Sequence, residues 1–273
     1  MRPLSLAPVA PASARVTVVK VGGRAQGDPA LAAALAARWR DAPEALCVVH
    51  GGGDEVSSLQ RRLGTEPVFR NGRRVTTTAD IDVLRMVLSG AANKRLVASL
   101  VACGVSAVGL SGEDAALIAA RLTSDSALGA VGEPECINVA LLRHLLAGDY
   151  LPVVSPVARQ ATVPGGRAGD AAALNVNGDD AAAAIAAALG APELLFVADV
   201  PGVSVNGAPA ALLDAAEAGL LVERGTASGG MAAKLDAAVH ALRHGVGRVR
   251  IGDIAAIADP SRGTEITLEG SLV

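Results

Sequence analysis

Aromatic side chains are nearly absent from this chain of 273 residues, at 1% of the composition. The hydrophobic share of 51% must therefore come mainly from Ala, Val and Leu, and such small side chains favour helices packed closely on a sheet. Aromatic platforms for stacking nucleic-acid bases are missing as well. Because the net charge is −3 and basic residues form no long run, we expect no nucleic-acid partner.

Cysteine is also scarce. Cys47, Cys103 and Cys136 are far apart and form no CxxC pair, which argues against a disulfide framework and against zinc. We expect these three to be core residues of a protein in a reducing compartment, and we expect no metal site built from side chains. The longest apolar stretch, 181–191, is too short to span a bilayer. The apolar part of 1–14 is broken by proline, so a cytoplasmic protein without membrane association is expected.

Several common signatures of catalytic or nucleotide-binding loops are missing. The chain has no GxxxxGK[ST], no complete GxGxxG, no GxSxG and no HExxH. Neither a P-loop protein nor a dehydrogenase is therefore indicated.

Short β-branched runs alternate with helical stretches along the chain, which is the pattern of an α/β fold. Strands are expected at 16–21, 45–49, 105–109, 151–154, 193–197 and 248–251, and helices at 29–40, 53–62, 78–103, 179–189 and 231–244. Asn71-Gly72 predicts a hairpin turn, and 163–169 a second hairpin tip or loop. Such alternation predicts a mainly parallel sheet covered on both faces. We expect a flexible tail at 1–15 and one domain at 16–273.

Glycine-rich segments follow the first two expected strands. In Lys20-Val-Gly22-Gly23 a cation stands at a strand end, and the glycine NH groups can approach an anion such as phosphate. A glycine turn beside an exposed lysine is the alternative interpretation. His50-Gly-Gly-Gly53 offers a second set of backbone donors where a helix begins. We assign no catalytic role to His50.

A third glycine pair begins a later helix. In Ser228-Gly-Gly-Met-Ala-Ala-Lys234 a helix start and a lysine together suit a phosphate, although an ordinary lysine with a buried stem fits as well. In Asn175-Val-Asn-Gly-Asp-Asp180, either Asn177 or Asp179 can cap the following helix. Alternatively, a carboxylate here could fix two lysines while an amide binds a substrate carboxylate. Arg74 could hold a carboxylate with its guanidinium, or belong to an ordinary basic hairpin.

Eight segments in this order resemble the acetylglutamate kinases of the amino acid kinase family, over 16–266. They are the five segments around Lys20, His50, Arg74, Asn175 and Lys234 together with Ala92-Asn-Lys94, Gly109-Leu-Ser-Gly-Glu-Asp114 and Asp199-Val-Pro-Gly202. The resemblance implies an α/β fold, an αβα three-layer sandwich with a mainly parallel central sheet. It also implies an acceptor-binding and dimerising N-lobe at about 16–174 and a nucleotide-binding C-lobe at about 175–273.

The resemblance assigns roles to individual residues. The catalytic set would be Lys20 and Lys234, which neutralise charge on the transferring phosphoryl group, and Asp179, which positions them. The acceptor would be bound by Gly52, Gly53, Arg74 and Asn175. The nucleotide would be bound by Gly22, Gly23, Asp199, Val200, Pro201, Gly202, Gly230 and Met231.

The implied reaction is transfer of the terminal phosphate of ATP to the γ-carboxylate of N-acetyl-L-glutamate, a step of arginine biosynthesis. Mg²⁺ would be held mainly by the nucleotide phosphates. Gly178 stands where members of the family often have alanine, and this segment also resembles kinases that phosphorylate aminoadipate derivatives. Such a kinase is therefore one alternative function. A non-catalytic nucleotide or amino-acid sensor is another. Since 1–14 cannot form the extra helix of arginine-inhibited members, we expect an unregulated homodimer.

Overall fold

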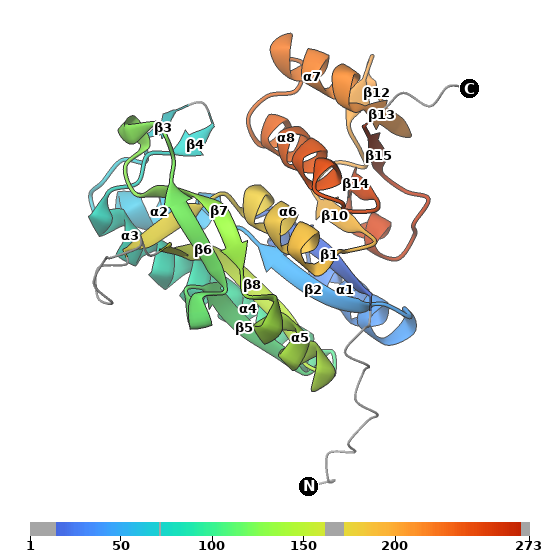
Figure 1. The fold of residues 1–273 in the computed structure, drawn as a ribbon, viewed down its shortest axis with the longest axis horizontal. Coiled ribbons are helices and arrows are strands. Elements are labelled where there is room, and N and C mark those ends of the chain that lie inside the picture. The colour runs from blue at the N-terminus through green and yellow to red at the C-terminus, as the bar shows by residue number, and fades with distance from the viewer. Residues whose placement is uncertain (1–14, 71, 162–171, 269–273) are drawn as a thin grey trace, which may run out of the picture.

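The computed structural model describes residues 15–70, 72–161 and 172–268, and a single large sheet runs through them (Figure 1). Its strands follow the spatial order β13-β15-β14-β10-β1-β2-β8-β6-β7-β9, and β5 also pairs with β8. They are β1 (Val16–Val21), β2 (Ala45–His50), β5 (Ala107–Gly112), β6 (Ile118–Leu122), β7 (Val131–Ile137), β8 (Leu151–Gln160), β9 (Ala173–Val176), β10 (Leu194–Val197), β13 (Leu212–Asp214), β14 (Val249–Gly252) and β15 (Thr264–Thr267). The pairings of β6 with β7, β8 with β9 and β14 with β15 are antiparallel, and the remaining ones are parallel.

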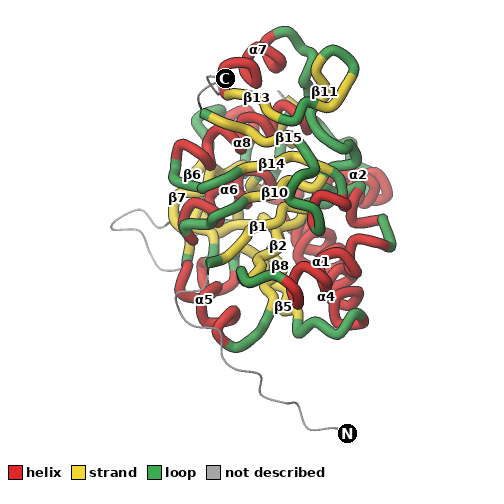
Figure 2. Tube along the Cα trace, turned by 90° about the vertical axis from the view of Figure 1, so that its right-hand side faces the viewer, coloured by secondary structure: helices red, strands yellow, loops and turns green. Residues whose placement is uncertain are grey.

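Helices cover both faces of this sheet (Figure 2). The helices α5 (Val139–Ala147), α6 (Gly178–Leu189) and α8 (Gly230–Arg243) pack on one face, and α1 (Ala30–Asp41) and α4 (Asn93–Ala102) pack on the other. Two more, α2 (Gly53–Arg62) and α3 (Thr78–Leu84), form a smaller apolar cluster with the π-helical segment Arg85–Ala92. The expected αβα sandwich with a mainly parallel sheet is therefore confirmed.

The central strand β1 lies between β10 and β2, in parallel with both. Successive side chains of a strand point to opposite faces, so Val16 and Val18 pack beneath α6 while Val19 and Val21 pack beneath α1. By the same alternation, Lys20 points to the α6 side of the sheet.

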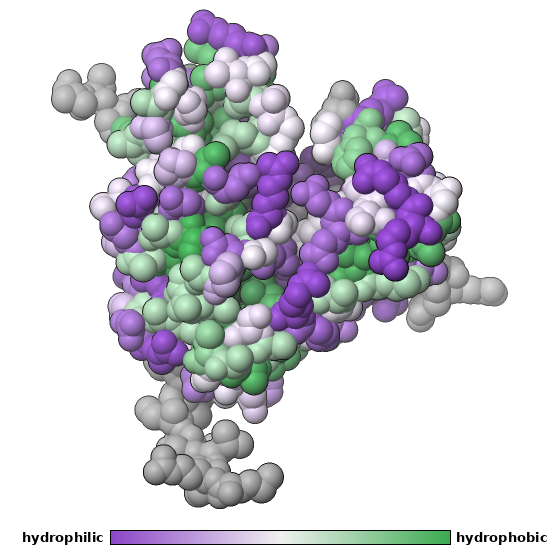
Figure 3. Space-filling model, turned by 180° about the vertical axis from the view of Figure 1, so that it is seen from behind, coloured by the Kyte–Doolittle hydropathy of each residue, from purple (hydrophilic) through white to green (hydrophobic). Residues whose placement is uncertain are grey.

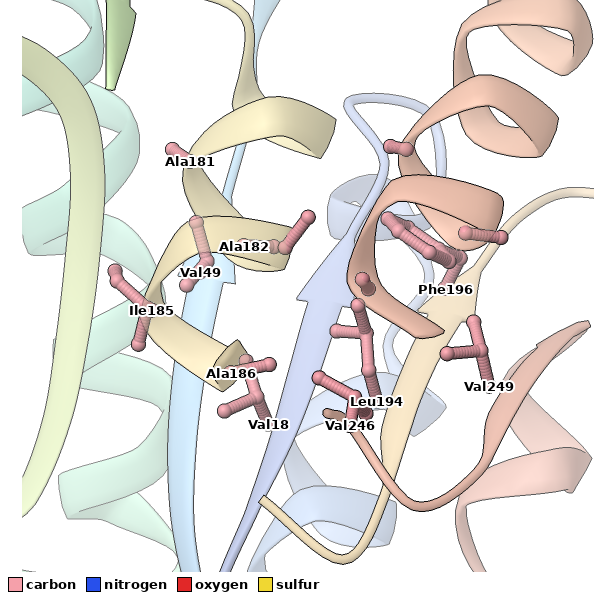
Figure 4. Close-up of a cluster of buried hydrophobic side chains, with 14 of the residues drawn as sticks. Val18, Val49, Ala181, Ala182, Ile185, Ala186, Leu194, Phe196, Val246 and Val249 are labelled. Atoms are coloured by element: carbon pink, nitrogen blue, oxygen red, sulfur yellow. The ribbon is translucent and has the colours of Figure 1, made fainter. Parts of the chain in front are cut away.

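Alanine builds the interface between α6 and the sheet. Ala181, Ala182 and Ala186 are fully buried, and with Ile185 they face Val18 and other strand residues (Figure 4). A methyl side chain lets the helix approach the sheet closely, as the composition predicts.

The expected elements differ from the observed ones at several places along the chain. The helical stretch expected at 78–103 is α3, a π-helical segment Arg85–Ala92 and α4 in succession. Strands β6 and β7 and helices α5 and α7 (Ala215–Glu223) were not among the expected elements. The expected hairpin is present as β3 (Phe69–Arg70) and β4 (Arg73–Arg74).

The cysteines are only partly where we expect them. Cys47 is buried in β2, Cys103 is partly exposed, and Cys136 is exposed on β7. The expectation of three core cysteines was therefore wrong for Cys136, because β7 pairs with β9 only at Val131 and Gly132 and its remaining part has β6 as its one paired strand, which leaves Glu135 and Cys136 exposed. All three are free thiols.

The tail at 1–14 and the loop at 163–169 lie outside the described residues. None of the helices in 15–70, 72–161 and 172–268 combines the length and the apolar character needed to cross a membrane.

Candidate active site

Three charged side chains from distant parts of the chain meet at the carboxyl end of β1. Lys20 Nζ lies 2.7 Å from Asp179 Oδ1, and Lys234 Nζ lies 3.4 Å from Asp179 Oδ2. Lys20 and Asp179 are 6% and 4% exposed. One carboxylate therefore bridges two ammonium groups, and the cluster keeps a net positive charge.

The charges of this cluster shift the pKa values of Asp179 and Lys234. Burial opposes the charge on Asp179, but Lys20 and Lys234 outweigh burial and lower the pKa of its carboxyl group. Burial and the nearby charge of Lys20 lower the pKa of Lys234, although Asp179 acts against them. An anion entering between the lysines would relieve their mutual repulsion.

Three helices begin at this cluster, each with a glycine at its first residue. They are α2 at Gly53, α6 at Gly178 and α8 at Gly230, and all three glycines line the same cavity. A helix N-terminus presents free NH groups and a partial positive charge. The helix starts and the lysines together make a site for a phosphate-like anion.

Asn177 determines where α6 begins. Its side chain accepts a hydrogen bond of 2.9 Å from the Asp179 backbone NH, so it is the N-cap residue. Asp179 is thereby free to direct its carboxylate at the lysines. Of the two roles considered for this segment, Asn177 has capping and Asp179 has the lysine contact.

The first two glycine loops contact each other beside the cluster. A Cβ added to Gly23 would lie 3.5 Å from the Gly52 Cα atom. Gly52 has φ +151°, and a Cβ there would come within 2.8 Å of Leu88 Cδ2, so a larger residue would be strained. Gly178 is less constrained, because a Cβ would lie at an ordinary 3.4 Å from Lys20 Cε. The replacement of alanine at this position therefore leaves the wall of the site little changed.

Arg74 forms a rigid part of the wall beside Gly53. Its Nη2 donates to Gly53 O and Ser57 Oγ, both at 2.8 Å, and its Nη1 donates to Gln60 Oε1. The guanidinium also stacks 4.7 Å above the ring of Phe69. Burial lowers the pKa of Arg74. The side chain is held by these contacts and lines the cavity.

Asn175, near the end of β9, lines the same cavity. Its Nδ2 donates to Thr76 Oγ1 at 2.9 Å, and Thr76 Oγ1 donates to the Arg74 backbone carbonyl at 3.0 Å. The two predicted acceptor residues are therefore linked through one threonine.

Two cavities meet at the charged cluster. One, of about 280 Å³, is lined by Arg74, Asn175 and the lysines; the other, of about 490 Å³, lies on the side of β10. Gly23, Gly53, Gly230 and Lys234 line both of them. In the space-filling view a notch bordered by hydrophilic side chains separates the two upper parts of the molecule (Figure 3). Such a division suits two reactants that meet at the shared residues.

The residues expected to bind nucleotide lie partly around the larger cavity. Gly22, Gly23, Asp199, Val200, Gly230 and Met231 line it. Pro201 and Gly202 are absent from its lining. Gly202 instead packs against β15, where a Cβ would come within 2.6 Å of Thr264 Oγ1.

His50 is fully buried beneath the glycine loop. Its Nδ1 lies 2.9 Å from Gly51 O and its Nε2 lies 3.0 Å from Asn93 Nδ2. Burial lowers the pKa of His50 to about 4, so the ring is neutral near pH 7. Both ring nitrogens have protein partners, and His50 lines neither cavity.

Residues that the motifs did not single out complete the site. Gln60 and Ser57 follow Gly53 at helical spacing on α2, and that spacing is the one signal that could have associated them with Arg74. Gln26 donates to Gly51 O at 2.8 Å, and Arg24 lines the larger cavity. In the described ranges, no three His, Cys, Asp or Glu side chains gather as a metal-binding group.

The family of the chain follows from comparison with known proteins. The sequence profile described as the amino acid kinase family matches residues 15–253. The chain belongs to this family. The expected family membership and sandwich fold are thereby confirmed.

Individual amino acid kinases match over most of this chain. The acetylglutamate kinase of Chloroflexus aurantiacus is 41% identical over 246 residues, which cover 89% of this chain and 94% of that protein. The acetylglutamate kinase of Roseiflexus castenholzii is 40% identical over 260 residues, or 93% of this chain and 95% of that protein. The crystal structure of smu.665 from Streptococcus mutans UA159 is similar with a TM-score of 0.81 and 27% identity, covering 93% of this chain and 99% of that one.

Proposed function

We propose that this enzyme is an acetylglutamate kinase, which transfers the terminal phosphate of ATP to the γ-carboxylate of N-acetyl-L-glutamate. The observation that carries the proposal is the position of Lys20, Asp179 and Lys234 where the two cavities meet. Relatives that carry this name are about 40% identical over nearly the whole chain. ATP is the expected phosphate donor of a kinase of this family.

The smaller cavity would hold the acceptor. Arg74 would pair with a carboxylate of the acceptor that is not phosphorylated, and Asn175 would donate to its other polar groups. The NH groups of Gly52 and Gly53 would bind the reacting end. The fixed contacts of Arg74 support this role, because a positioned guanidinium needs no reorganisation when the substrate binds.

The larger cavity would hold the nucleotide, with Gly22 and Gly23 against its phosphates and Asp199, Val200, Gly230 and Met231 along its length. Pro201 and Gly202 would support the Asp199 loop. Asp179 already pairs with both lysines, so the donor set around the transfer point fits a Mg²⁺ ion held mainly by the nucleotide phosphates. When bound there, the ion supplies further neutralisation of phosphate charge.

In the proposed reaction the protein positions the two substrates and stabilises the charge on the transferring phosphoryl group. The acceptor carboxylate attacks the γ-phosphorus directly while the bond to the β-phosphate oxygen breaks, so no covalent enzyme intermediate forms. Lys20 and Lys234 stabilise the charge on the transferring group and on the leaving oxygens. Asp179 keeps the two ammonium groups apart and in place.

The remaining expectations form part of the same proposal. Residues 16–174 would form the lobe that binds acceptor and dimerises, and residues 175–273 the lobe that binds nucleotide. We further propose a cytoplasmic homodimer not inhibited by arginine, acting in arginine biosynthesis. ATP supply and three free cysteines suit that compartment.

An ADP-release assay tests the function and its rival together. N-acetylglutamate, free glutamate and N-acetyl-aminoadipate are offered side by side, and turnover of N-acetylglutamate is expected. Turnover of the aminoadipate compound alone would mean that the enzyme is instead a kinase of an aminoadipate derivative.

Lys20→Ala and Lys234→Ala should each lower kcat about 100-fold or more, because each removes a charge contact in the transition state. Unchanged turnover in either variant would refute the role assigned to that lysine. Absence of wild-type turnover with all three acceptors would favour the non-catalytic sensor.

A further inference from the structure

Arg24 is an exposed arginine at the edge of the larger cavity, directly after Gly22 and Gly23. Its side chain is 75% exposed and belongs to the loop between β1 and α1. Nη1 lies 3.0 Å from Asp199 Oδ2, and Nε lies 3.7 Å from Asp54 Oδ2. The guanidinium thus spans from the β1 loop to the loop that follows β10.

Both partners of Arg24 are themselves exposed. The side chains of Asp199 and Asp54 are 53% and 81% exposed. Ion pairs between exposed side chains contribute little, because water screens the charges and the side chains lose freedom. A ligand of higher negative charge can therefore displace either carboxylate from Arg24.

The distribution of cations in the larger cavity favours such a ligand. Within its described lining, Arg24 and Lys234 are the two basic residues. Lys234 pairs with Asp179, at the boundary with the acceptor cavity. Arg24 lines the larger cavity and not the smaller one, so its charge is available to the part of a polyphosphate that lies away from the acceptor cavity.

We propose that Arg24 is a nucleotide-binding residue whose guanidinium leaves Asp199 and binds phosphate oxygens of the bound nucleotide. The planar fork of arginine matches two phosphate oxygens at once. The inference rests on the proposed function, since it takes ATP as the occupant of the larger cavity. A purely structural tie between the two loops is the competing interpretation, and it predicts that removing Arg24 leaves nucleotide affinity unchanged or makes it tighter.

The test uses the full chain with Arg24→Met, which removes the charge but keeps the length, and Arg24→Lys, which keeps the charge but removes the fork. Arg95→Met is the matched control, because Arg95 is also exposed and pairs with Glu55 at 2.6 Å but lines neither cavity. The measurements are KM for ATP, KM for N-acetylglutamate, kcat, and the Kd of Mg-ADP by calorimetry without acceptor.

Arg24→Met should raise KM for ATP and Kd for Mg-ADP about tenfold, the usual effect of losing one charge-assisted hydrogen bond. KM for N-acetylglutamate should stay within about twofold of the wild type. Arg24→Lys should fall between the wild type and Arg24→Met, and Arg95→Met should match the wild type.

Wild-type nucleotide affinity in Arg24→Met, or affinity tighter than wild type, would overturn the assignment and favour the structural tie. An equal loss of nucleotide affinity in Arg95→Met would also overturn the assignment, because it would show that any lost surface charge weakens nucleotide binding. If instead the wild-type enzyme binds Mg-ADP but phosphorylates no acceptor, the proposed function fails while the calorimetric comparison still decides the role of Arg24.

Discussion

Two adjacent carboxylates, Asp179 and Asp180, have opposite electrostatic environments. Asp179 lies between Lys20 and Lys234, and the pKa of its carboxyl group is lowered although burial acts against this. Asp180 has Arg73 at 3.1 Å, but burial together with nearby acidic groups raises its pKa to about 6. Two neighbouring residues of α6 therefore have carboxyl pKa values shifted in opposite directions, down for Asp179 and up for Asp180.

Asp180→Asn should change the pH dependence of stability. A carboxyl group with a pKa near 6 in the folded protein and about 3.9 in the unfolded chain favours folding fully below the lower value. That contribution is lost as the pH rises through 6. Relative to the wild type, Asp180→Asn should therefore gain melting temperature from pH 4 to pH 7 in a series of thermal melts. A difference that does not vary with pH would contradict the raised pKa of Asp180.

At the scale of one element, the N-terminus of α6 connects stability with activity. Asn177 caps the helix and Asp179 lies in its first turn. The cap therefore fixes the position of the Asp179 carboxylate relative to Lys20 and Lys234. Helix α7 offers a comparison, because Asp214 caps it with a capping box and lines neither of the two cavities.

Asn177→Ala and Asp214→Ala should each cost about 1 kcal/mol of stability, the usual effect of losing an N-cap. Only Asn177→Ala should also lower kcat, by about tenfold or more, because a loosened first turn misplaces the Asp179 carboxylate. Denaturant unfolding and steady-state kinetics on both variants provide the measurements. Equal loss of kcat in the two variants would mean that activity follows stability alone.

At the scale of the whole molecule, the bounds of the buried strands and helices are the feature that the sequence predicts most accurately. Strand β1 has the expected bounds, and α6 and α8 begin within one residue of them, because long Val or Ala runs bounded by glycine leave few alternatives. Strands β6 and β7 were missed since Arg121, Glu133 and Pro134 interrupt their apolar pattern. Their pairing depends on contacts with β8 and β9.

The candidate site was predictable for a different reason. Nothing local connects Lys20 with Asp179 or Lys234, and only the resemblance of ordered motifs placed them together. Arg24 and Gln60 carry no motif, so their position follows from the fold alone.

The proposed homodimer and its insensitivity to arginine can be tested directly. We expect light scattering to give twice the chain mass of 27.1 kDa, and activity to persist with millimolar arginine. A hexamer, or inhibition by micromolar arginine, would contradict the proposed unregulated homodimer.

The central position of β1 has a consequence for synthesis on the ribosome. Val18 pairs with Leu194, so more than half of the chain separates two neighbouring strands. The first strand to leave the ribosome exit tunnel therefore remains without one of its two neighbours until most of the chain has been translated. Pairings this distant in sequence form late and slowly. A nascent chain shorter than 234 residues cannot place Lys234 beside Asp179 and Lys20, so under the proposed function we expect no consumption of ATP before Lys234 has been translated.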